Sequence, residues 1–196
     1  HRARITRMTS RAAEDIELIN RYLGGDIAAF DELVRAHEDR VFGICLRMMR
    51  DRDAALDAVQ ETFVTVFRKA DRYQAKAAFS TWLYRVAVNT CYDQLRKAKR
   101  RQADPLPDSV DPAEPRAAAP LHAAELRPDI ARALSEIPEE VRAAVVLVDL
   151  EGLALEQAAD ILDKPIGTIK SRVFRGRKLL AEGLGNLRAG SRHPME

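Results

Sequence analysis

Hydrophobic residues recur every three or four positions along most of this 196-residue chain, with polar residues between them. This spacing is the period of an α-helix that buries one face and leaves the other in water. Asp26 and the Asp51–Asp53 run provide polar starts for two of these segments. The helices that the pattern predicts cover approximately residues 13–23, 27–50, 54–70, 80–101, 129–137, 138–151, 155–162 and 165–187.

The apolar segment 141–150 also fits the pattern of a buried strand, but nothing in the sequence pairs with it, so we expect a helix. Six of the nine prolines lie between residues 105 and 128. Because proline lacks an N–H and clashes with the preceding turn, this stretch predicts an extended acidic linker. The expected fold class is all-α, with two helical domains at 10–101 and 126–188 joined by the Pro-rich linker 102–125.

The charges are nearly balanced overall but unevenly placed along the chain. The totals are 32 Lys+Arg and 30 Asp+Glu, for a net charge of +2. Basic residues concentrate near 85–101 and again at 164–178, where six basic and no acidic residues occur. Two separate basic stretches favour a polyanion that is contacted in two places. For either stretch alone, a solvated helix face is an equally good interpretation.

The sequence argues against an enzyme, a metal centre or a membrane-spanning protein. Cys45 and Cys91 lie within apolar helical patterns and are expected to be buried, and the four histidines are scattered. There is no Gly-rich phosphate loop and no nucleophile–base pair. No apolar run approaches the ~20 residues needed to cross a bilayer. We therefore expect no catalysis, no cofactor, no metal ligand, no small-molecule substrate and no direct insertion into a membrane.

The segments 155–162 and 165–187 have the proportions of a helix-turn-helix unit. With the apolar positions turned inward, short hydroxyls and cations stay free near the start of the second helix. Such side chains suit a recognition helix, because arginine and lysine contact phosphates and guanine edges. An ordinary pair of helices with a basic face is the alternative. The predicted duplex-DNA contacts are Thr168, Lys170, Ser171, Arg172, Phe174, Arg175 and Lys178.

Aromatic residues are interleaved with cations between residues 73 and 101. This combination suits single-stranded DNA, since bases stack on rings while phosphates meet cations. An amide such as that of Asn89 can also bond the edge of an unstacked base. For Trp82 taken alone, packing in the core is the better interpretation. The predicted single-strand contacts are Tyr73, Trp82, Tyr84, Arg85, Asn89, Arg96 and Lys97.

Motifs in both halves resemble one known family. The second half contains Ile137–Arg142 (IPEEVR), Glu151–Leu153 (EGL) and Ile166–Arg177 (IGTIKSRVFRGR) in order, and the first half contains Asp57–Phe63 (DAVQETF) and Phe79–Asn89 (FSTWLYRVAVN). These segments resemble region 4 and region 2 of the extracytoplasmic-function (group 4) RNA polymerase sigma factors. The resemblance covers nearly everything except the linker and the ends.

The resemblance implies a bacterial transcription initiation factor that recruits core RNA polymerase, reads the −35 element with region 4, and melts and captures the −10 element with region 2. The loop at 72–78 would hold a flipped base. The alternative is a stand-alone helix-turn-helix regulator, which does not need the aromatic-basic segment 57–101. An anti-sigma factor is expected to control the protein in a stress or envelope response. The location would be the cytoplasm, with attachment to the membrane only through that factor.

The same resemblance implies two contacts on polymerase, the β′ coiled coil and the β flap. Polar residues beside an apolar stripe suit helix–helix docking on the coiled coil, although a solvated outer face fits the same pattern. The residues expected to bind core polymerase are Asp57, Gln60, Glu61, Phe63 and Arg68.

Three residues depart from the family pattern in region 4. Ala154 stands where a capping Ser or Thr is usual, which removes a bond worth about 1 kcal/mol. Asp163 replaces the common turn glycine, and Asp tolerates a positive φ better than most residues. Gly176 replaces a helical alanine at a cost of up to about 1 kcal/mol in helix propensity.

Overall fold

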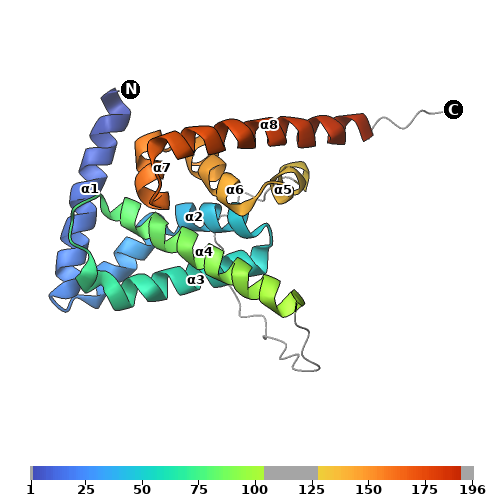
Figure 1. Ribbon diagram of the computed structural model, residues 1–196. Coiled ribbons are helices and arrows are strands. Elements are labelled where there is room, and N and C mark those ends of the chain that lie inside the picture. Colours follow the sequence, from blue (N-terminus) through green and yellow to red (C-terminus); the bar gives the residue numbers. More distant parts are fainter. Residues whose placement is uncertain (1, 104–127, 191–196) are drawn as a thin grey trace.

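A computed structural model of the chain describes residues 2–103 and 128–190, and the described part consists of helices and short connections (Figure 1). The first half contains α1 (Arg2–Leu23), α2 (Ile27–Met49), α3 (Arg52–Lys69), the 3₁₀ turn η1 (Ala70–Arg72) and α4 (Phe79–Ala103). The second half contains α5 (Pro128–Ser135), α6 (Glu139–Val145), the π-helical turn η2 (Val146–Leu150), α7 (Leu155–Leu162) and α8 (Ile166–Gly190). The all-α prediction is confirmed, while nearly all of the predicted linker lies outside the described residues.

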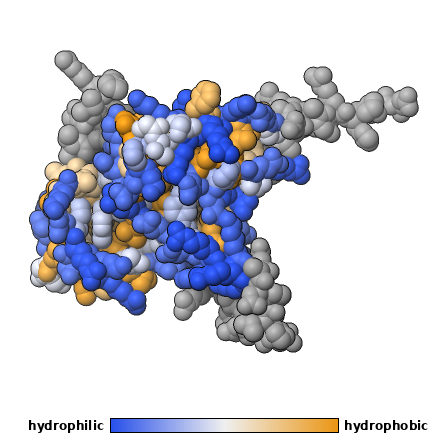
Figure 2. All heavy atoms as spheres, viewed as in Figure 1, coloured by the Kyte–Doolittle hydropathy of each residue, from blue (hydrophilic) through white to orange (hydrophobic). Residues whose placement is uncertain are grey.

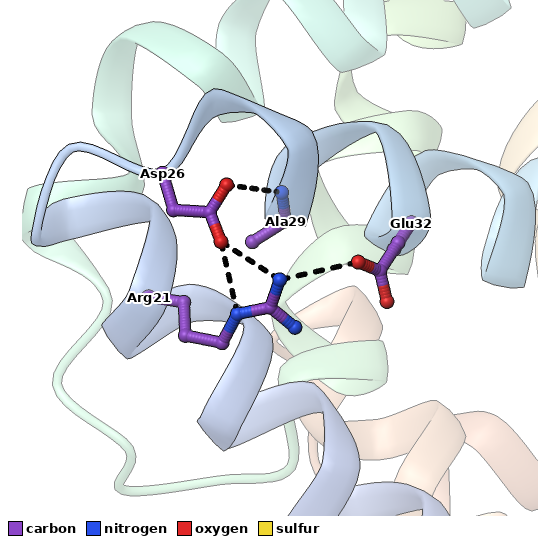
Figure 3. A network of polar contacts seen from close by, with 4 residues as sticks. All are labelled: Arg21, Asp26, Ala29 and Glu32. Carbon is purple, nitrogen blue, oxygen red and sulfur yellow. Dashed lines mark hydrogen bonds and ion pairs between the residues drawn. The ribbon is translucent and has the colours of Figure 1, made fainter.

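The turn between α1 and α2 is held by a small polar network (Figure 3). The carboxylate of Asp26 accepts the backbone N–H of Ala29 and caps α2, as the sequence indicates. Nη2 of Arg21 donates to Asp26 at 2.7 Å and to Glu32 at 3.2 Å. The hydrogen bond from Arg21 lowers the pKa of Asp26, so this carboxylate stays ionised while it caps the helix.

The helix-turn-helix connection follows the chemistry of its unusual residues. Asp163 ends α7 with φ 51° and ψ 52°, the left-handed conformation for which the sequence prepares. Ala154 offers no side-chain oxygen at the start of α7. Instead, Oε1 of Gln157 accepts the backbone N–H of Ala154 at 3.0 Å, which satisfies one group at this terminus. Half of a capping box therefore remains despite the alanine.

Gly176 has a packing reason that the sequence pattern does not reveal. It lies in α8 where this helix crosses α6, and a Cβ at Gly176 would stand 2.2 Å from Cγ2 of Val145 and 3.1 Å from Cγ1 of Val141. The two helices approach so closely that no side chain fits between them. The glycine lowers helix propensity but permits this close approach.

The two halves share one apolar core. Buried residues of α6 and α7, such as Leu147 and Ile161, belong to the same continuous cluster as Ile44 of α2 and Leu83 of α4. In Figure 1, α8 runs along the outer side of α5, α6 and α7, and these shorter helices lie between α8 and α2. Two helical units are therefore present, and in this structure they are packed together.

None of the helices within 2–103 and 128–190 is long and apolar enough to span a membrane. In the same ranges, no cluster of three histidine, cysteine or acidic side chains is arranged to bind a metal ion.

Candidate nucleic-acid interface

The N-terminal half of α8 presents the side chains predicted to read duplex DNA. Ile169 and Val173 are buried, so the intervening residues face outward. Phe174 is 76% exposed, which is unusual for a large apolar side chain and suits contact with a thymine methyl group. Thr168 and Arg172 are half-buried, and the exposed members of the predicted set are Lys170, Ser171, Phe174, Arg175 and Lys178.

Arg172 is neutralised by the start of α6. Its guanidinium donates to the carboxylate of Glu140, and only 16% of its side chain is exposed. Next to this pair, Nζ of Lys99 from α4 lies 2.7 Å from Oε1 of Glu139. These four side chains and Arg175 line an open groove of about 520 Å³. The two basic stretches of the sequence therefore meet at one place on the surface.

The exposed face of α4 carries the cations predicted to bind single-stranded DNA. Arg85, Asn89, Arg96 and Lys97 are all exposed. Figure 2 shows hydrophilic side chains gathered over this helix. Asp93 pairs with Arg96 at 3.2 Å and lowers the net charge of that stretch only in part.

The loop before α4 has a fixed and strained shape. The hydroxyl of Tyr73 donates to the carbonyl oxygen of Ala77 at 2.7 Å, and Ala75 adopts a left-handed φ of 53°. The ring of Tyr73 lies 5.6 Å from that of Phe79 and 5.7 Å from that of Trp82. Tyr73 and Trp82 are half-buried, so each ring keeps an accessible part beside the loop. Strained backbone of this kind often marks a functional site.

Tyr84 is placed differently from the other predicted DNA contacts. It is only 3% exposed, and the guanidinium carbon of Arg40 lies 5.6 Å from the centre of its ring. Burial raises the pKa of Tyr84. A base cannot stack on this ring in the present arrangement, and its role in DNA binding stays a prediction.

The outer face of α3 carries the residues predicted to bind polymerase. Asp57, Gln60, Glu61 and Arg68 are exposed, whereas Phe63 is half-buried. The amide of Gln94 on α4 donates to Glu61 at 2.9 Å, which fixes one of these carboxylates.

Two apolar residues on this face were not predicted as site residues. Val64 is 46% exposed and Phe67 is 45% exposed. Because Val64 follows Gln60 by one helical turn, its spacing was the available signal. The sequence pattern instead assigns Phe67 to the core. Its ring does pack against Tyr22 and Phe30, but much of it remains open to solvent.

Family models match both halves of the chain. Residues 33–101 match the family described as Sigma-70 region 2, which includes most of α2 and all of α3 and α4. Residues 127–180 match Sigma-70, region 4, which includes the helix-turn-helix unit.

Curated relatives agree with this assignment. The chain is 39% identical over 176 residues to the ECF RNA polymerase sigma factor SigM of Mycobacterium tuberculosis, with 90% of this chain and 87% of SigM covered. It is 41% identical over 166 residues to the ECF RNA polymerase sigma factor SigE of Mycolicibacterium smegmatis. That match covers 82% of this chain but 64% of SigE, so this relative has further segments outside the match.

Solved structures share the fold. The sigma factor RpoE in complex with the anti-sigma factor NepR from Bartonella quintana superposes with a TM-score of 0.64 at 27% identity, covering 81% of this chain and 98% of that one. CnrH in complex with the cytosolic domain of CnrY gives a TM-score of 0.66 at 22% identity, covering 88% and 98%, and supports the fold alone. With both regions matched and relatives similar over most of their length, the chain belongs to the ECF RNA polymerase sigma factors.

Proposed function

We propose that this sigma factor recruits core RNA polymerase to promoters, reads the duplex −35 element with α8, and captures the unpaired −10 element with α4 and the loop before it. It performs no catalysis itself. The observation that carries the proposal is the pairing of two different surfaces in one chain. One is a recognition helix, and the other is a basic helix next to half-buried aromatic rings.

The duplex-reading role of α8 rests on the side chains that its start presents. Lys170 and Arg175 are exposed cations, and Ser171 and Phe174 lie between them. Arginine can bond a guanine edge at two points, and lysine neutralises a phosphate. The set therefore combines backbone positioning with base recognition, as a sequence-specific reader requires.

The melting role rests on the loop and on the exposed face of α4. Tyr73 and Trp82 offer ring surface beside the loop, and the amide of Asn89 is exposed on the following turns. A base that leaves the duplex loses stacking and pairing energy, and contacts with these groups would offset that loss. Strand separation would thus be driven by binding energy.

The polymerase-binding role is assigned to the outer face of α3. Val64 and Phe67 add apolar area among Asp57, Gln60, Glu61 and Arg68. An apolar centre with a polar rim is the usual composition of a helix-docking surface. We assign this face to the β′ coiled coil, and region 4 to the β flap.

We further propose that an anti-sigma factor restrains this protein in the cytoplasm and, where that factor is membrane-bound, holds it at the membrane. The support is the similarity to RpoE, whose structure was solved with the anti-sigma factor NepR.

The test is assembly with core RNA polymerase from a related bacterium, followed by size-exclusion chromatography. We expect a stoichiometric complex for the natural chain. Val64→Asp should weaken it roughly tenfold or more, because a charge would enter an apolar contact. Leu23→Asp, at another exposed apolar position, is the matched control and should bind normally.

Failure of the folded chain to bind core polymerase, together with tight binding of duplex DNA by the chain alone, would replace the sigma assignment with the stand-alone regulator. Equal losses in Val64→Asp and Leu23→Asp would remove α3 as the docking face but leave the overall function in place.

A further inference from the structure

The contact between the two halves covers side chains that the proposed function needs. Nη2 of Arg85, on the predicted single-strand surface of α4, donates to the backbone carbonyl of Asp160 in α7. Tyr84, the next residue along α4, is buried in the same region. On the other side, Arg172 of α8 is neutralised by Glu140. Both proposed DNA surfaces are therefore partly occupied within the chain.

A single acidic residue joins the halves at the centre of this contact. Glu151 follows η2, and its carboxylate lies 2.7 Å from Nη1 of Arg47 and 3.2 Å from Nε of Arg40, both on α2. Arg40 also donates to the backbone carbonyl of Glu151 at 2.5 Å. The Glu151 side chain is only 10% exposed, so solvent screens these ion pairs less than pairs on an open surface.

A glycine on α2 makes room for this ion-pair cluster. Gly43 lies in the interior of the helix, where glycine is unfavourable compared with alanine. A Cβ at Gly43 would stand 2.7 Å from Nη1 of Arg47 and 3.2 Å from Oε1 of Glu151. An alanine would therefore push the guanidinium and the carboxylate out of their present positions.

The same contact buries one charge without complete compensation. Arg142 of α6 is 2% exposed, and its Nε and Nη1 atoms have no hydrogen-bond partner. Burial lowers the pKa of Arg142, and the nearby positive charge of Arg50 lowers it further. Separation of the halves would return this guanidinium to water, which favours opening. The closed arrangement is therefore held by one set of charges and opposed by another.

Promoter geometry requires the two DNA surfaces to separate. Here Lys99 of α4 and Arg175 of α8 line the same groove. The −10 and −35 elements are some two dozen base pairs apart, which corresponds to roughly 80 Å along a duplex at about 3.4 Å per pair. One chain cannot contact both elements while these residues lie side by side.

We propose that the closed arrangement is an autoinhibited state of the free protein, in which Glu151 locks region 4 onto region 2 through Arg40 and Arg47. Opening then precedes full engagement of DNA. The meaning of this lock for promoters rests on the proposed function, but the lock itself does not.

The test measures the distance between the halves in the full chain. Donor and acceptor dyes are placed at Lys69 on α3 and Ala181 on α8, both exposed, as non-natural amino acids that leave Cys45 and Cys91 intact. We expect high energy transfer in the natural chain. Glu151→Gln should raise the ratio of open to closed molecules about tenfold or more. Gly43→Ala should act in the same direction, with every charge retained.

The control is Glu156→Gln, which makes the same change of charge at an exposed position of α7. A second readout is affinity for a random duplex DNA, which should increase in proportion to the open fraction. Glu151→Gln should therefore bind more tightly than Glu156→Gln, up to about tenfold.

Unchanged energy transfer in Glu151→Gln and Gly43→Ala, with normal helical circular dichroism, would overturn the lock. Low energy transfer in the natural chain would overturn the closed state itself. Open variants that bind duplex DNA no better than Glu156→Gln would overturn autoinhibition. Because neither readout contains polymerase, failure of the proposed function would show separately, as absence of a complex with core enzyme.

Discussion

At the scale of single residues, Gly176 shows how one missing side chain sets the position of a recognition helix. The close approach of α8 to α6 is possible only because no Cβ stands between them. The branched side chain of Val145 has few alternative rotamers with which to make room. Region 4 therefore accepts weaker helix propensity in α8 in exchange for close packing beneath it.

Gly176→Ala should lower the free energy of unfolding by about 1–3 kcal/mol, because an overpacked contact costs more than the gain in helix propensity. Gly167→Ala is the matched control, since a Cβ there meets no atom within 4 Å. It should be neutral or stabilising by up to about 1 kcal/mol. Urea denaturation of both variants measures the difference, and a stable Gly176→Ala would contradict the close packing.

Local chemistry could be predicted from the sequence at several positions, and long-range contacts could not. The cap at Asp26 and the left-handed Asp163 depend on neighbouring residues alone, so both predictions are confirmed. The burial of Tyr84 depends on Arg40 and on the packing of the second half, which no local pattern encodes. The reason for Gly176 likewise lies in a different helix.

At the scale of elements, α4 serves two purposes on opposite faces. Leu83 and Cys91 are buried in the core, while Arg85 and Asn89 face outward. The period of the apolar residues predicted both faces correctly. It did not predict that α7 would pack against α4, because the apolar face of α7 was assigned to the core of its own half.

Asn89→Ala should reduce open-complex formation by the holoenzyme more than initial promoter binding, by about tenfold, because a lost base contact affects only the unpaired state. Asn20→Ala, at an exposed asparagine of α1, is the control. Permanganate reactivity of unpaired thymines measures opening, and filter binding measures the closed complex. Equal losses in the two assays would count against base capture by Asn89.

At the scale of the whole molecule, Tyr92 of α4 reports whether the halves are together. Burial raises the pKa of Tyr92 from 10.0 to about 12, and charged groups of the second half, including Arg172 and Glu140, act on it as well. The buried phenol is favoured in its neutral form. Its contribution to stability is therefore complete below pH 10 and is lost as the pH rises toward about 12.

The tyrosinate absorbance of the natural chain minus that of Tyr92→Phe should titrate near pH 12. In Glu151→Gln the same difference should move toward the ordinary pKa of about 10, since opening returns the phenol to water. An identical curve in both backgrounds would mean that the second half does not cover Tyr92.

The π-helical turn η2 has a consequence for how this family member can change in length. The N–H of Glu151 bonds the carbonyl of Val146 at 2.9 Å, so the turn contains one more residue than a regular helix would hold there. Deleting one residue would restore regular winding and rotate whatever follows by about 100°. Glu151 would then point away from α2. Substitutions in this turn are tolerable to evolution, but a one-residue deletion would release region 4 from region 2.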